Sequence, residues 1–206
     1  MRTKRILMLI LITSGLWSCS YEDPIRSDVT EFPEMELTGE PYIFLNLGAT
    51  FEDPGAIAKA GEENLEVNVK GAVDTEVPGV YTLTYSAKNA DGFPASVKRF
   101  VAVGYKEVVE GRDLSGTYAP ANTVTRLTTG FYHNSDLLPT NELPGVMVDL
   151  GNGQLIIPVQ SSPSGDIYAD PAIDPETFGT LNADMSFTFH QMISCCGIYT
   201  RTFVKQ

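Results

Sequence analysis

The fold is decided by residues 78–87, which read Pro78-Gly79-Val80-Tyr81-Thr82-Leu83-Thr84-Tyr85-Ser86-Ala87. The side chains alternate, with Tyr81, Leu83, Tyr85 and Ala87 on one face and hydroxyl side chains on the other. A period of two that is rich in β-branched and aromatic residues is typical of a half-buried β-strand. The Pro-Gly pair predicts a turn, so we expect this strand to start at a corner.

Short strands are expected on both sides of this one. The turn Asn89-Ala90-Asp91-Gly92 leads into a returning strand over residues 96–103, and upstream strands are expected at 42–45 and 66–70. Short strands at this spacing, separated by turn residues, predict an antiparallel β-sandwich.

Tyr81 stands at the corner itself. In Greek-key sandwiches a tyrosine at such a corner packs its ring inward, while its hydroxyl bonds to upstream backbone. We predict that hydrogen bond for Tyr81. The alternative is a plain Pro-Gly turn ahead of a core tyrosine.

Several pieces of this half together resemble a known family. They are GATFEDPGAIA at residues 48–58, VDT at 73–75, PGVYTLTY at 78–85 and RFVAV at 99–103. In this order they are similar to the bacterial immunoglobulin-like domain of Bacteroidetes surface lipoproteins and of adhesion and glycan-handling proteins. The resemblance implies a spacer or binding module; it does not imply catalysis, and it supplies no site residues.

The second half carries its own strands. They are expected at 115–118, 123–128, 145–150, 154–160, 185–191 and 198–204. Gly151-Asn152-Gly153 predicts a hairpin, and residues 161–180 read as a long loop with a short helical turn near 174–178. The predicted fold class is all-β, an N-terminal immunoglobulin-like β-sandwich over 30–105 and a small antiparallel β-sheet or barrel-like domain over 111–206. We expect the two halves to fold separately.

Residues 1–18 read as a lipoprotein signal peptide. A basic start precedes an apolar run at 6–12 that is too short to span a bilayer. Leu16 and Ser18, three residues and one residue before Cys19, resemble the lipobox of bacterial lipoproteins, whose cysteine is acylated. We predict lipidation of Cys19. The alternative is an ordinary signal with an incidental cysteine.

Residues 19–29 are acidic and lack apolar periodicity, as a flexible tether should. The pair Glu22-Asp23 resembles the surface-export signal of Bacteroidetes lipoproteins. We therefore expect a lipid-anchored protein of the outer membrane that faces the cell exterior. The alternatives are a merely solvated linker and the inner leaflet of that membrane.

The charge balance excludes nucleic-acid binding. The chain has 206 residues with 14 Lys and Arg against 26 Asp and Glu, a net charge of −12, and phosphate neutralisation needs a basic face. The two histidines, His133 and His190, lie in no catalytic motif. We expect no enzyme and no cofactor.

Two further clusters carry side chains capable of chemistry. Cys195 and Cys196 are adjacent, and in an exported protein they could form a vicinal disulfide. The alternative is one buried and one outward thiol. The Pro-rich loop carries four acids, Asp166, Asp170, Asp174 and Glu176. Their oxygens could hold Ca²⁺, but their spacing is not that of an EF-hand. We therefore predict a solvated loop without a metal.

Aromatic residues in the second half are the candidates for ligand binding. Flat rings stack on sugar faces, and polar neighbours bind sugar hydroxyls. The alternative is that the rings fill the core under loops. The predicted ligand-binding residues are Phe131, Tyr132, Asn134, Asp136, Tyr168 and Phe178.

The predicted function is a non-catalytic glycan-binding accessory. A lipid anchor, an immunoglobulin-like domain and a small β domain resemble small lipoproteins of starch-utilisation-type glycan uptake systems. Expected partners are the membrane, a polysaccharide and outer-membrane glycan transport proteins. The alternative is a structural or adhesion protein that binds other cell-surface proteins.

Overall fold

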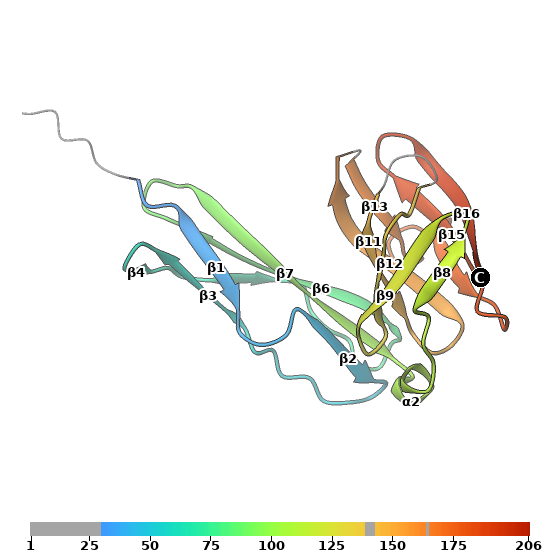
Figure 1. Cartoon of the computed structure of the whole chain (residues 1–206). Coiled ribbons are helices and arrows are strands. Elements are labelled where there is room, and N and C mark those ends of the chain that lie inside the picture. The colour runs from blue at the N-terminus through green and yellow to red at the C-terminus, as the bar shows by residue number, and fades with distance from the viewer. Residues whose placement is uncertain (1–29, 139–142, 164) are drawn as a thin grey trace, which may run out of the picture. The chain divides into compact units, whose positions relative to one another are not determined.

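The computed structural model describes residues 30–138, 143–163 and 165–206. The predicted signal peptide, Cys19 and the tether lie outside the described residues. Two β-structures follow one another along the described chain (Figure 1), so the predicted all-β fold class is confirmed. None of the helices in these ranges is long and apolar enough to cross a membrane.

The first structure is a sandwich of two sheets. Strands β2 (Tyr42–Asn46) and β7 (Pro94–Gly104) pair in parallel, and all other neighbouring strands are antiparallel. One sheet has the order β1 (Pro33–Leu37), β3 (Ala56–Ala60), β4 (Glu63–Asn64), and the other has the order β2 (Tyr42–Asn46), β7 (Pro94–Gly104), β6 (Gly79–Lys88), β5 (Asn68–Lys70).

Strand β6 follows its sequence pattern closely. Leu83, Tyr85 and Ala87 are buried at alternate positions. The Tyr81 hydroxyl donates a 2.8 Å hydrogen bond to the Val77 carbonyl, four residues upstream. The predicted corner is therefore confirmed.

A buried arginine joins the two sheets. Arg99 on β7 has no exposed side-chain surface, and its guanidinium donates to the Asp53 carboxylate and to the Tyr85 hydroxyl. Tyr85 in turn donates to Asp53. The remaining donors of Arg99 reach the carbonyl oxygens of Thr38 at 2.6 Å, Glu40 at 3.0 Å and Gly55 at 3.2 Å.

Alkaline pH should weaken this network. Burial, followed by the hydrogen bond to Asp53, raises the pKa of Tyr85 to about 12. Because the unfolded phenol ionises near pH 10, the stability that Tyr85 contributes is complete below about pH 10 and is lost as the pH rises toward 12. Absorbance titration at 295 nm should show phenols that ionise late, and Tyr85→Phe should reduce that late fraction.

The second structure is a closed up-and-down barrel. Consecutive strands pair antiparallel, except that β13 (Gly165–Ala169) and β14 (Phe178–Leu181) do not pair with each other. The last strand, β16 (Gly197–Lys205), pairs with the first, β8 (Gly116–Ala119), to close the ring, so a barrel rather than an open sheet forms. Its strands are β8 (Gly116–Ala119), β9 (Asn122–Thr128), β10 (Phe131–Asn134), β11 (Gly145–Asp149), β12 (Gln154–Ser162), β13 (Gly165–Ala169), β14 (Phe178–Leu181), β15 (Phe187–Ile193) and β16 (Gly197–Lys205).

Strands β13 and β14 share one position in the ring. Both lie between β12 and β15 and run in the same direction, so they form one strand that is interrupted by residues 170–177. The sequence predicted a single loop over 161–180, and that prediction is wrong. Each piece is too short to show an alternating pattern, and the Pro-rich insertion hides their continuity.

Strand β10 is not among the strands expected from the sequence. Its first residues, Phe131 and Tyr132, point to opposite faces, yet both are buried. Tyr132 belongs to the barrel core, whereas Phe131 faces the sandwich. Burial on both faces removes the alternation by which a strand is recognised.

Side chains fill the barrel interior. Phe187, Phe189 and Phe203 pack against one another, with the rings of Phe187 and Phe203 stacked at 4.7 Å. The Tyr118 hydroxyl donates to the Leu114 carbonyl at 2.8 Å, which repeats the four-residue corner of Tyr81.

The two tyrosine corners give a matched pair of variants. Tyr118→Phe should lower the free energy of unfolding by about 1–3 kcal/mol, because it leaves the buried Leu114 carbonyl unpaired. Tyr81→Phe should cost less, about 0.5–1.5 kcal/mol, because water can reach its exposed partner. Urea unfolding of both variants tests this order, and equal losses would contradict it.

A second apolar cluster joins sandwich and barrel; we call it the joint cluster. Phe44 and Ala102 of the sandwich pack with Phe131, Val148 and Ile156 of the barrel. Separate folding of residues 30–105 and 111–206 stays a prediction. Since each half covers apolar surface of the other, separating the halves would expose the joint cluster to water and lower the stability of each half.

The segment between the halves is held in place. It contains the short helix α2 (Lys106–Glu110), and Arg112 then forms two hydrogen bonds, of 2.7 and 2.8 Å, with the fully buried carboxylate of Asp149. The Tyr105 amide also donates to the Leu150 carbonyl at 2.8 Å.

Candidate functional site

One face of the barrel wall gathers uncharged side chains from three neighbouring strand positions. The register places their outward residues in three rows, which together we call the uncharged wall. The rows are Tyr168, Met192 and Ile198; Phe178, His190 and Thr200; and Thr180, Thr188 and Thr202.

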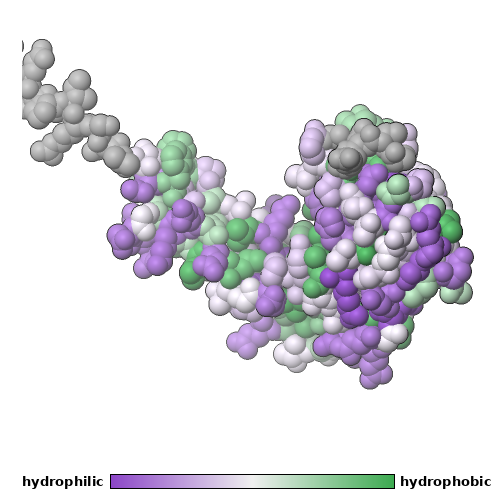
Figure 2. All heavy atoms as spheres, viewed as in Figure 1, coloured by the Kyte–Doolittle hydropathy of each residue, from purple (hydrophilic) through white to green (hydrophobic). Residues whose placement is uncertain are grey.

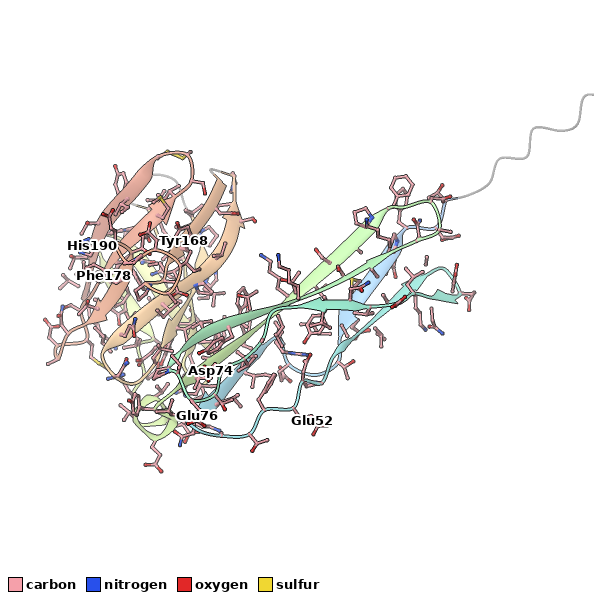
Figure 3. The ribbon with its side chains drawn as sticks, turned by 180° about the vertical axis from the view of Figure 1, so that it is seen from behind. Glu52, Asp74, Glu76, Tyr168, Phe178 and His190 are labelled. Atoms are coloured by element: carbon pink, nitrogen blue, oxygen red, sulfur yellow. A yellow bond between two sulfur atoms is a disulfide. The ribbon has the colours of Figure 1, made fainter. Side chains whose placement is uncertain are left out.

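The middle row is ordered by direct contacts. The rings of Phe178 and His190 stack with centroids 4.3 Å apart and an interplanar angle of 27°. His190 Nδ1 lies 3.0 Å from Thr200 Oγ1, so the imidazole is fixed on both sides. Phe178 remains 38% exposed and offers ring surface to solvent. Figure 3 shows Tyr168, Phe178 and His190 together on this wall.

The interrupted strand brings the two aromatic rings together. Tyr168 faces Met192 and Phe178 faces His190, so they occupy successive outward positions although ten residues separate them in sequence. Two residues of strand correspond to about 7 Å. The outer face of a barrel therefore acquires a pair of aromatic side chains in line.

The loop between them is closed at its base. Asp170 and Thr177 are buried, and Thr177 Oγ1 lies 2.9 Å from the Asp174 carbonyl and 3.2 Å from that of Asp170. The Asp170 carboxylate accepts from the Ala172 amide, and burial raises the pKa of Asp170. This closure lets β14 continue the line of β13.

The wall is uncharged in an acidic protein. None of its nine positions carries a carboxylate, a lysine or an arginine. Thr188 and Thr202 share a 2.8 Å hydrogen bond between their hydroxyls, which marks a polar edge below the rings. In the view of Figure 2, by contrast, hydrophilic side chains cover much of the barrel surface.

The structure separates the six residues that were predicted to bind ligand. Tyr168 and Phe178 lie together on the uncharged wall. Phe131 is buried in the joint cluster, with its ring 5.2 Å from that of Tyr42, and Tyr132 is buried in the barrel. Neither ring is available for stacking on a ligand.

The two polar candidates lie at one end of the barrel, where they hold the chain together. Asn134 is buried and accepts from the Asn122 amide at 2.7 Å. Asp136 accepts from the amides of Leu138 and Leu143 and pairs with Arg201 at 3.4 Å. Both side chains are already hydrogen-bonded to other residues of the protein.

Sequence reasoning missed His190 and its neighbours on β16 as site residues. The alternation of Phe187, Phe189 and Gln191 had already placed His190 on the outer face of a strand. A hairpin register drawn through the turn at 194–197 would have placed Thr200 opposite it.

The acids of the loop satisfy backbone and hydroxyl donors nearby. Asp166 accepts from Ser161 Oγ at 2.9 Å, and Asp174 accepts from the Glu176 amide at 3.0 Å. Within the described ranges, no group of three or more His, Cys, Asp or Glu is arranged to hold a metal ion.

The two cysteines of the second half lie in the turn between β15 and β16. Their sulfurs are bonded, 2.12 Å apart, and both residues are exposed. The bond joins neighbours in one turn and so ties no distant segments together.

Residues 35–103 match the model of a family described as "Bacterial surface protein, Ig-like domain". The match covers the segment whose motifs resemble such a domain, so that resemblance is confirmed. It ends before the barrel begins at Gly116. A search of the curated proteins found no match.

Two solved structures align with most of the chain. One is the lipoprotein BT2262 from Bacteroides thetaiotaomicron, with 22% identity over 85% of this chain and 100% of that chain, at a TM-score of 0.37. The other holds CBM51-2, in complex with GlcNAc, and INT domains from Clostridium perfringens ZmpB, with 14% identity over 84% of this chain and 38% of that chain, at a TM-score of 0.30. Both scores are low, and neither the fold nor the site rests on these two structures.

Proposed function

We propose that this chain is a non-catalytic glycan-binding lipoprotein, held in the outer membrane through Cys19 and facing the cell exterior. The observation that carries glycan binding is the in-line pair Tyr168 and Phe178 beside exposed hydroxyls. The lipobox resemblance supports the anchor, and the match of residues 35–103 to a bacterial surface domain supports the location.

The chemistry of the uncharged wall suits a sugar. A pyranose presents an apolar face of C–H groups and an edge of hydroxyls, and aromatic rings combine large contact area with a defined geometry. Phe178 and Tyr168 would contact the face, while Thr200 and His190 would bind the edge. In this proposal the immunoglobulin-like sandwich spaces the barrel from the membrane.

The same composition argues against catalysis at this site. Glycoside hydrolysis uses a pair of carboxylates that flank the bond. The uncharged wall holds one imidazole and no carboxylate, and the nearby Asp166 is engaged by Ser161. The proposed role is therefore capture, with transfer of the glycan to outer-membrane transport proteins.

A panel of neutral polysaccharides tests the proposal. We expect the mature chain to be retarded in affinity electrophoresis by at least one of soluble starch, mixed-linkage β-glucan, galactomannan and arabinoxylan. Phe178→Ala should weaken that binding by about tenfold or more, because it removes a ring that the sugar would cover. Leu127→Ala, which removes an exposed apolar side chain from β9, is the control and should bind normally. Binding by Phe178→Ala as tight as by the control would refute the site.

Adhesion to another surface protein is the second candidate. The exposed apolar side chain of Ile198, beside Met192 and Tyr168, favours it, because methionine and aromatic residues are enriched in protein interfaces. If no polysaccharide binds, loss of cell–cell contact on Ile198→Asp would support this function instead.

The lipid anchor has its own test. Cys19→Ala should abolish acylation and move the protein from the detergent phase to the soluble fraction, because one thioether-linked anchor holds it. Cys196→Ala is the control: Cys196 lies far along the chain from the tether, so this variant should partition as the unmodified protein does. Recovery of Cys19→Ala in the detergent phase would contradict the anchor.

A further inference from the structure

We infer that the uncharged wall binds the interior of a long, uncharged polysaccharide, with the sugar chain lying along β13 and β14. This inference rests on the proposed function and adds the class of glycan, its direction on the barrel and the part of the polymer that is bound. Three observations carry it: the line of the aromatic residues, the absence of charge and the open shape of the wall.

The aromatic residues define a direction. Tyr168 and Phe178 occupy successive outward positions on one interrupted strand, so a line through them runs parallel to β13 and β14. A sugar chain that stacks on both rings must follow this line. The hydroxyl side chains lie to one side of it, on β15 and β16, where they meet one edge of the chain.

The charge of the surroundings selects a neutral ligand. The wall offers no lysine or arginine to pair with a uronate or a sulfate. Carboxylates border it instead: Asp166 precedes Tyr168 on the outer face of β13, and Asp174 and Glu176 lie in the loop that leaves between the two rings. An anionic polysaccharide would meet like charges without a compensating cation.

The shape of the wall selects the interior of a chain. The outer face of a closed barrel is convex, and the register places all nine side chains on that face. Sites that enclose a monosaccharide or a chain end are concave and bury most of the ligand. A polymer can instead pass across the wall and continue at both ends.

Two rings in line make affinity depend on length. A short oligosaccharide engages one ring at a time, whereas a longer one engages both, and the second contact is intramolecular. Affinity should therefore rise with length until the chain covers Phe178 and Tyr168 together, and then level off.

The test uses the full mature chain with the polysaccharide that is bound in the panel. Calorimetry with oligosaccharides of increasing length from that polymer should show no measurable monosaccharide binding and an affinity that rises with length. Tyr168→Ala should keep the affinity for short oligosaccharides and lose the gain for long ones, at least about fivefold. Leu127→Ala should retain the full dependence on length.

The preference for an uncharged polysaccharide is tested with a charged derivative of the same polymer. A carboxymethylated derivative of the bound polymer should bind at least about tenfold more weakly at low salt, and added salt should recover part of that loss. Monosaccharide binding as tight as polymer binding, or equal affinity for the carboxymethylated polymer, would overturn this inference while leaving glycan binding intact. Failure of every neutral polysaccharide would instead overturn the proposed function, and this inference with it.

Discussion

Replacing Arg99 with methionine is expected to lower the free energy of unfolding by about 3–5 kcal/mol, as the removal of one partner from a buried ion pair typically does. Arg99 is fully buried, and its guanidinium donates to a carboxylate, a phenol and three carbonyl oxygens. Methionine matches much of its apolar stem and supplies none of these donors. Asp53 would keep its charge without its partner.

The network explains why the sandwich tolerates a buried cation. The carbonyls of Thr38 and Gly55 belong to the segments that follow β1 and precede β3, and Asp53 lies just before Gly55. Arg99 on the opposite sheet therefore fastens both segments to β7. Without Arg99, both segments would lose their hydrogen bonds to β7, and Asp53 would lose its ion pair.

Lys98→Met is the matched control, because it removes one positive charge from the neighbouring exposed position of the same strand. Guanidinium chloride unfolding should show a loss below about 0.5 kcal/mol for Lys98→Met. If Arg99→Met is too unstable to purify, Asp53→Asn is the second variant, with a smaller loss in the same direction, since the amide oxygen still accepts one hydrogen bond. Equal stability of the Arg99 and Lys98 variants would contradict the network.

The sequence predicts strands β2, β6 and β7 well and the network poorly, for one physical reason. The alternation of Val97, Arg99, Val101 and Val103 places Arg99 on the inner face, but a charged side chain in such a pattern usually indicates solvent. Its burial depends on Asp53 and on carbonyls that are remote in sequence. The motif at residues 51–55 is recognisable, whereas its partner is fixed only by the packing of the two sheets.

The candidate site was predictable in part for a similar reason. Tyr168 and Phe178 stand out as aromatic residues near a Pro-rich loop, but their pairing depends on an interrupted strand that resumes in register after residue 177. Phe131 and Tyr132 looked equally suitable. Tyr132 is buried in the barrel core, whereas the burial of Phe131 on the other face of β10 depends on the sandwich, which no local pattern of the barrel sequence records.

Phe131→Ala is expected to lower the free energy of unfolding by about 3–5 kcal/mol, the usual range for removal of a fully buried phenylalanine. The side chain faces outward from the barrel, where an alanine would normally be neutral. It is buried because Tyr42 and Phe44 of the sandwich cover it. The loss therefore reports how much the joint cluster, rather than the barrel core, contributes to the free energy of unfolding.

A double-mutant cycle of Phe131→Ala with Phe44→Ala measures the coupling between these two side chains of the joint cluster. Because both side chains belong to one cluster across the junction, their effects should be non-additive by about 0.5–3 kcal/mol. Phe131→Ala with Leu127→Ala is the control cycle, since Leu127 is exposed on β9, and its effects should add within about 0.5 kcal/mol.

The same cluster decides how the halves behave when they are separated near Glu110. In the isolated barrel Phe131 would face water, so Phe131→Ala should change its melting midpoint little, whereas in the full chain it should lower the midpoint by several degrees. Each isolated half should also melt below the full chain, because each exposes the surface that the other covers. Equal losses for Phe131→Ala in the isolated barrel and in the full chain would place the ring in the barrel core and remove the junction as a source of stability.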